Sequence, residues 1–185
     1  MATLFLDLNF SDFCWDIKKG WLVKEFQNWG NSFSVEFDIQ VTKLNSGEWQ
    51  NVFHFTASNQ EFGENHGDRI PALWINKAGF FLIVSSLNDN GNYYTNVDFQ
   101  LGKTYQFTIQ QLKKDGKYWY EIIIDGNSTL KLENNNPLNF STVYLYASDP
   151  WFESFTSEFG SICNIKIRFG GKCALIKYNF DSVSI

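Results

Sequence analysis

The sequence predicts an all-β fold, built as a sandwich or barrel in a single domain over residues 1–185. Aromatic residues make up 18% of the chain, and such side chains favour the pleated, half-buried surface of a sheet. Short apolar runs, many of them alternating with polar residues, recur between turn signals along the chain, which is typical of sandwiches and barrels. No segment shows the period of about 3.6 residues that marks an amphipathic helix.

The strands predicted in the N-terminal half differ in how they are covered. Phe33–Val41 alternates most clearly, with an apolar residue at every second position. Asn51–Ala57 alternates as well, whereas Ile70–Ile75 and Phe80–Val84 are apolar on both faces, which indicates strands covered on both sides. The two earlier predicted strands are Thr3–Phe10 and Trp21–Phe26.

An Asp-Gly pair at 115–116 predicts a two-residue hairpin. Its strands are Thr104–Leu112 and Lys117–Ile124. In that register Phe107 meets Ile124 and Ile109 meets Ile122, so that one face of the hairpin is continuously apolar.

The C-terminal part is predicted to hold a strand, Thr142–Ala147, and a second hairpin around Gly170-Gly171. The strands of that hairpin are Ile162–Phe169 and Cys173–Phe180. Because the first and last predicted strands are both apolar, we expect them to lie side by side and close the sheet.

The chain has three cysteines, Cys14, Cys163 and Cys173. In the register of the second hairpin, Cys163 faces the core and Cys173 faces away from it, so these two should not bond to each other. This predicts three free thiols.

Composition argues against several partners and locations. The net charge is −5 and the basic residues are scattered, so no nucleic-acid partner is expected. No run approaches the roughly 18 apolar residues that would cross a bilayer, so no membrane insertion is expected. The N-terminus carries Asp7 and Asp12 and no basic region, unlike a signal peptide. If Met1 is native, this favours a cytoplasmic or non-classically secreted protein.

Four phrases together resemble a known family: Gly47–Phe55, Arg69–Ile75, Gly102–Ile109 and Tyr146–Trp151. Over residues 33–167 the chain is similar to a concanavalin A-like lectin/glucanase domain of the laminin-G type. The resemblance implies an antiparallel two-sheet jelly-roll sandwich. It also implies an extracellular location, a glycan or protein ligand, and in some members calcium at a loop edge.

The sequence departs from two motif patterns of this fold, one of a glycosidase class and one of the galectins. Laminarinase-type glycosidases carry Glu-x-Asp-x-x-Glu on one strand; here Glu36 and Asp38 match, but Val41 stands at the third position. These two carboxylates share a strand face. They are either a ligand-binding or catalytic pair, or two solvated positions on an alternating strand. His54 lies on a strand similar to the His strand of galectins, whose Asn-Pro-Arg and Trp-Gly-x-Glu motifs are absent here.

The polar loop Ser58–Arg69 is a candidate metal site. Glu61, Glu64 and Asp68 gather there, and Asp149 on another loop could add a further ligand. Carboxylate oxygens of this kind bind calcium, so the predicted cofactor is calcium or none. The alternative is a solvated loop in which Asp68 or Glu64 pairs with Arg69.

The predicted ligand-contacting residues are Glu36, Asp38, His54, Arg69 and Trp151. Exposed on its loop, Trp151 could stack on a sugar or a protein partner; buried, it would plug the end of the sandwich. His54 could likewise be a satisfied structural residue.

The sequence therefore favours a non-enzymatic recognition module that binds glycan or protein through loops and a sheet face. One alternative is a structural protein that self-associates into homo-oligomers through its edge strands. Another is a glycoside hydrolase that uses Glu36 and Asp38.

Overall fold

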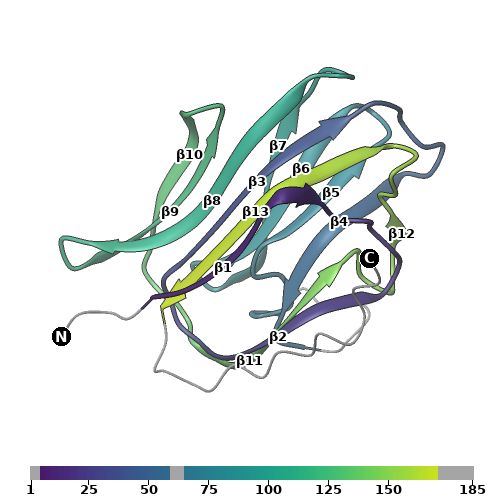
Figure 1. The fold of residues 1–185 in the computed structure, drawn as a ribbon. Helices are drawn as coiled ribbons and strands as arrows, with labels where there is room; N and C mark the ends of the chain where they lie inside the picture. Colours follow the sequence, from purple (N-terminus) through teal and green to yellow (C-terminus); the bar gives the residue numbers. More distant parts are fainter. Residues whose placement is uncertain (1–4, 59–64, 171–185) are drawn as a thin grey trace.

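The computed structural model describes residues 5–58 and 65–170, which form thirteen β-strands in two layers (Figure 1). One sheet has six strands, in the order β1 (Phe5–Cys14), β13 (Gly160–Gly170), β3 (Phe33–Val41), β8 (Thr104–Lys114), β9 (Lys117–Ile124) and β10 (Asn127–Asn134). The other has seven, in the order β2 (Trp21–Trp29), β11 (Phe140–Ala147), β4 (Trp49–Thr56), β5 (Ala72–Asn76), β6 (Phe80–Leu87) and β7 (Asn90–Asp98), with the short β12 (Glu153–Ser154) parallel to β4. The predicted all-β, antiparallel two-sheet sandwich is confirmed.

The described residues include no helix long and apolar enough to span a membrane.

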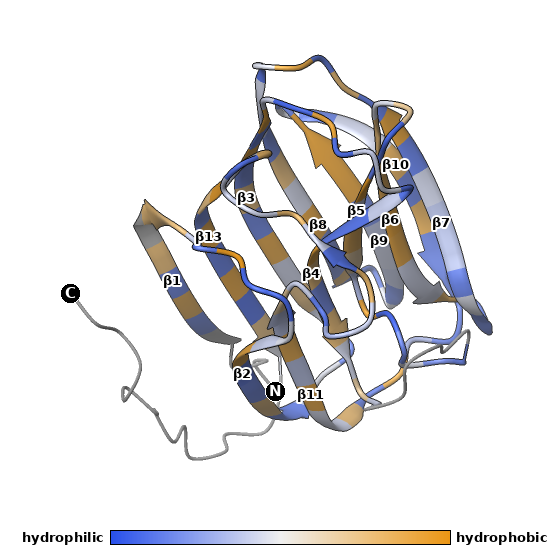
Figure 2. Cartoon of the chain, turned by 90° about the vertical axis from the view of Figure 1, so that its right-hand side faces the viewer, coloured by the Kyte–Doolittle hydropathy of each residue, from blue (hydrophilic) through white to orange (hydrophobic). Residues whose placement is uncertain are grey.

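The core lies between the sheets and follows the predicted alternation. The five apolar residues of β3, from Phe33 to Val41, are all buried, as expected. Figure 2 shows this alternation as hydrophobic and hydrophilic bands along β3 and β13. Phe37 stacks on Phe107 of the same sheet at 5.1 Å and meets Phe53 of the other sheet edge-on at 5.2 Å. Aromatic packing of this kind joins the two layers.

The predicted hairpin of β8 and β9 is confirmed in its register. Phe107 lies opposite Ile124, and Ile109 lies opposite Ile122. The turn residues Asp115 and Gly116 both have positive φ, 52° and 81°, which matches the twist of a two-residue hairpin.

Three strands were not predicted: β7, β10 and the two-residue β12. β7 and β10 each lie at the end of a sheet and have a largely exposed or half-exposed surface. An edge strand with little buried surface needs no regular apolar period, so alternation gives no signal there.

The prediction of three free thiols is wrong, because Cys14 and Cys163 form a disulfide. β1 pairs antiparallel with β13, and this register places the two cysteines directly opposite each other. The predicted strand Thr3–Phe10 stops short of Cys14, whereas in the structure the strand continues to Cys14 and brings it into the ladder with β13.

The prediction that Cys163 faces the core is also wrong. The register of β13 shifts between Cys163 and Lys166, with Asn164 at a φ of 56°. This irregularity changes the phase of the strand, so Ile162 and Ile165 are buried while Cys163 is only half-buried.

The other half of the predicted C-terminal hairpin, Cys173–Phe180, lies outside the described residues, so its pairing with the first strand is untested. Within the described chain, β13 is paired along both edges, with β1 and β3 (Figure 1).

Candidate ligand-binding groove

The outer face of the seven-stranded sheet carries a groove of about 460 Å³ over β4 to β7. We call it the aromatic groove. Its lining residues are Trp49, Arg69, Trp74, Phe80, Leu82, Val84, Asn92, Tyr94, Asn96 and Phe152. A hollow of this size is within the range of small-ligand sites.

Strand register explains why these side chains meet. Trp74 of β5 lies opposite Leu82 of β6, which lies opposite Asn96 of β7. Val84 and Tyr94 form the next cross-strand pair. Residues paired across antiparallel strands project to the same face. The pairing of β5, β6 and β7 therefore places the apolar residues of the groove floor beside the polar residues of its rim.

Aromatic rings form much of the groove wall. Trp49 meets Phe80 edge-on at 5.7 Å, and Trp74 meets Phe152 in the same way at 5.7 Å. Trp74 is buried in a small cluster with Ala72 and Val84, apart from the main core. Tyr94 is 62% exposed, which leaves it accessible to a ligand at the rim.

The polar groups of the groove include one guanidinium and two amides. Arg69 hydrogen-bonds through Nη1 to Oδ1 of Asn92, and its Cζ lies 5.2 Å from the centre of the Trp74 ring. The indole Nε1 of Trp74 is buried and has no acceptor among the described residues. Within the described chain, no carboxylate belongs to the lining.

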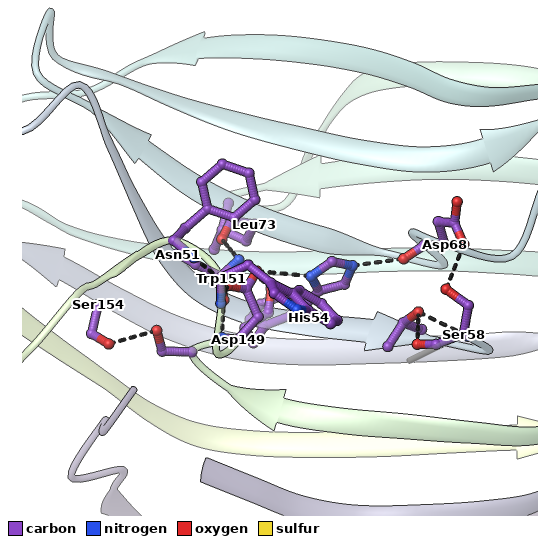
Figure 3. A network of polar contacts seen from close by, with 12 residues as sticks. Asn51, His54, Ser58, Asp68, Leu73, Asp149, Trp151 and Ser154 are labelled. Carbon is purple, nitrogen blue, oxygen red and sulfur yellow. Dashed lines mark hydrogen bonds and ion pairs between the residues drawn. The ribbon is translucent and has the colours of Figure 1, made fainter. Parts of the chain in front are cut away.

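A buried polar network supports the wall beside Trp74 (Figure 3). The register of β4 shifts between Asn51 and Phe53, so Asn51 pairs with Trp74 and His54 pairs with Ala72, both on the outer face. Asn51 is fully buried there and accepts a 2.8 Å hydrogen bond from the Asp149 amide. The loop after β11 is thereby held against the outer face of β4.

His54 bridges two loops. Its Nε2 lies 2.6 Å from the carbonyl oxygen of Asp68, and its Nδ1 lies 2.9 Å from Oδ2 of Asp149. A carbonyl oxygen only accepts, so Nε2 carries a hydrogen. The Nδ1 contact then needs a second proton, carried by the ring or by the carboxyl group.

Asp149 in turn fixes part of the groove. Its Oδ1 accepts hydrogen bonds from the amides of Trp151 at 3.0 Å and Phe152 at 2.8 Å. The second of these residues is a lining side chain. The network therefore positions the groove wall from beneath.

The structure places only one predicted ligand-contacting residue, Arg69, in the groove. His54 lies beneath it and meets Trp74 edge-on at 5.4 Å. Trp151 is half-buried and contacts His54 and Tyr146. Burial, and then the neighbouring Tyr144, raises the pKa of Tyr146.

Glu36 and Asp38 lie on β3, in the opposite sheet from the groove. Glu36 Oε1 lies 3.4 Å from Nη1 of Arg168, and Asp38 accepts a 2.7 Å hydrogen bond from Asn164. The structure thus separates this carboxylate pair from the aromatic groove by the thickness of the sandwich.

The predicted calcium ligands are only partly described. Asp68 accepts hydrogen bonds from Ser58 and from the Asn65 amide, and both oxygens of Asp149 are bonded as above. Glu61 and Glu64 lie outside the described residues. Among those described, no group of three or more acidic, His or Cys side chains could hold a metal ion, and calcium stays a prediction.

Sequence reasoning missed most of the groove, notably Trp49, Trp74, Tyr94 and Asn96. Apolar residues on both faces of a strand predict burial on both sides. This holds for β5, whose residues are all buried, whereas Phe80 and Leu82 of β6 are only half-buried and line the groove. The usable signal was the combination of tryptophans on two strands with a Tyr- and Asn-rich segment after them.

Comparison with known proteins identifies structures that share this fold. No protein-family model matches the chain, and no curated protein matches it significantly. The binding domain of botulinum neurotoxin serotype G matches with a TM-score of 0.52 and 13% identity, covering 80% of this chain and 35% of that one. The receptor binding domain of botulinum neurotoxin D matches at 0.50 and 12%, covering 92% and 45%.

A third match is the Trypanosoma rangeli sialidase in complex with 2-keto-3-deoxy-D-glycero-D-galacto-2,3-difluoro-nononic acid. Its TM-score is 0.51 at 8% identity, and it covers 81% of this chain and 25% of that one. This chain spans less than half the length of each of the three structures. At these identities the matches show the fold, which is the concanavalin A-like lectin/glucanase jelly roll.

Proposed function

We propose that this chain is a non-enzymatic recognition module that binds a glycan in the aromatic groove. The observation that carries the proposal is the composition of the groove: aromatic rings from separate elements around one hollow, with amides and a guanidinium among them. Pockets with an apolar lining and a few placed polar groups are the usual form of small-ligand sites.

The chemistry suits a saccharide. A sugar ring has C–H faces, which pack on aromatic rings, and hydroxyls, which both donate and accept hydrogen bonds. The half-buried Trp49 and the exposed Tyr94 supply aromatic surface, and the amides of Asn92 and Asn96 supply donors and acceptors in one side chain. Tyr94 and Asn96 are exposed on β7, so a ligand can reach both.

The opposite outer face has a different character. On the six-stranded sheet, Arg168 pairs with both Asp7 and Glu36. A hydrogen bond from Ser128, the largest of several contributions, lowers the pKa of Glu121, which also lies 3.5 Å from Lys131. Paired charges of this kind are typical of a solvated surface, so the groove is the stronger candidate for ligand binding.

The fold comparisons agree with a recognition role, since two of the matched chains are described as a binding domain and a receptor binding domain. A hydrolase needs two carboxyl groups at the scissile bond. In the hydrolase alternative the pair is Glu36 and Asp38, which lie outside the groove, and an assay on β-glucans with Glu36→Gln as control tests it.

A broad glycan array followed by calorimetry tests the proposal. We expect a hit whose affinity falls at least about tenfold in Tyr94→Ala, because loss of a central aromatic contact is costly. The control is Leu101→Ala, which removes a 55% exposed side chain that does not line the groove. Binding lost equally in both variants, or an array without any hit, would argue against the proposal.

A further inference from the structure

The side chain of Arg69 is held in a defined position at one end of the groove. Its backbone oxygen accepts hydrogen bonds from the amide of Ser86 at 2.8 Å and from the Ser86 hydroxyl at 3.0 Å. Its guanidinium lies over Trp74 and hydrogen-bonds to Asn92. A guanidinium fixed by stacking and hydrogen bonding loses little freedom when it binds a ligand.

Charge is distributed unevenly along the groove. Arg69 is the one charged residue among the described lining residues, in a chain whose net charge is −5. Asp98 is the one acidic residue of β7, and it lies opposite Phe80. It follows Asn92 by six positions, or about 20 Å of extended strand. The groove therefore has a cationic end at Arg69 and an acidic flank beyond Phe80.

The cationic end fits an oxyanion. The planar guanidinium offers several N–H donors in a fork that matches a carboxylate or a sulfate group. A negatively charged acceptor at this end would meet both a charge and donor groups.

We infer that the groove selects an acidic saccharide, with the anionic group of one sugar unit at Arg69 and the rest of the glycan directed along β7. The inference rests on the proposed glycan-binding function and adds the class of ligand. The anion is a sugar carboxylate or a sulfate ester, since both present the oxygens that a guanidinium recognises.

The test compares three matched sets of oligosaccharides: neutral ones, the same backbones carrying a uronic or sialic acid, and the same backbones carrying a sulfate ester. We expect one anionic set to bind at least about tenfold more tightly than the neutral set. Which anionic set binds identifies the source of the charge. The preference should weaken with added salt, because exposed charge interactions are screened.

Arg69→Met keeps an apolar stem over Trp74 and removes the charge. It is expected to lower the affinity for the anionic set by about 10- to 100-fold while changing the affinity for neutral glycans by less than about threefold. Arg168→Met, on the opposite sheet, is the matched control and should leave both affinities unchanged. Thermal unfolding of each variant checks that the fold is intact.

The outcomes separate the two claims. Neutral and anionic glycans bound equally, or an equal loss for both in Arg69→Met, would overturn the acidic-ligand inference and leave glycan binding in place. No binding by any of the three sets would overturn both.

Discussion

At the scale of single residues, the shape of the groove depends on a buried side chain that does not line it. Asp149 is fully buried and makes three hydrogen bonds, with the His54 ring and with the amides of Trp151 and Phe152. Buried carboxylates persist only when their oxygens are satisfied. The residue therefore links the stability of the outer loops to the shape of the binding wall.

Two substitutions at this position are expected to differ. Asp149→Ala should lower the free energy of unfolding by about 3 kcal/mol or more, because it leaves buried donors without an acceptor. Asp149→Asn should cost less, since its amide oxygen still accepts from the loop amides and its NH₂ group can donate to Nδ1 of a neutral His54. Urea denaturation measures both; equal losses would contradict this account of the network.

At the scale of elements, β1 is joined to the sheet by a covalent bond as well as by its ladder. The disulfide between Cys14 and Cys163 spans 149 residues of sequence. Closing a loop of that length removes a large part of the freedom of the unfolded chain. The bond thus stabilises the pairing of an edge strand, which would otherwise be held on one side only among the described strands.

Thiol titration tests this bond. Denatured, unreduced protein should show one free thiol per chain, because two of the three cysteines are bonded. Cys14→Ser should lower the free energy of unfolding by about 2–5 kcal/mol. Cys173→Ser, which leaves the disulfide intact, is the control for changing a cysteine. Three thiols before reduction would show that the bond is absent.

At the scale of the whole molecule, the two sheets are joined by a polar contact inside their largely apolar interior. The hydroxyl of Tyr120 on β9 hydrogen-bonds at 2.7 Å to that of Ser85 on β6, and both residues are buried. Burial raises the pKa of the Tyr120 phenol. The folded protein therefore holds this group neutral at pH values where an exposed tyrosine ionises.

The sign of the pH effect follows from that shift. Above about pH 10 the unfolded chain releases the Tyr120 proton while the folded chain retains it, so stability falls as pH rises. Below that pH the group is neutral in both states and contributes no such dependence. Tyr120→Phe should reduce the alkaline loss of stability, measured by urea midpoints from neutral to alkaline pH. Tyr94→Phe, at an exposed tyrosine, should leave the loss nearly unchanged.

The sequence alone determined the fold class and much of the strand pattern. Alternation in β3 identified its buried face, and an Asp-Gly pair fixed the register of β8 and β9. These features are local, since the period of side chains along a strand and the chemistry of a two-residue turn are set by neighbouring residues. The sequence pattern did not predict the edge strands β7 and β10, because little of their surface is buried.

Tertiary structure alone decided the site. The aromatic groove combines β4 to β7 with Arg69 from one loop and Phe152 from another, and the disulfide joins cysteines near opposite ends of the chain. Such contacts depend on which strands become neighbours and on irregularities such as the shifts in β4 and β13. A one-residue shift moves side chains to the other face, and no local pattern in the sequence records it.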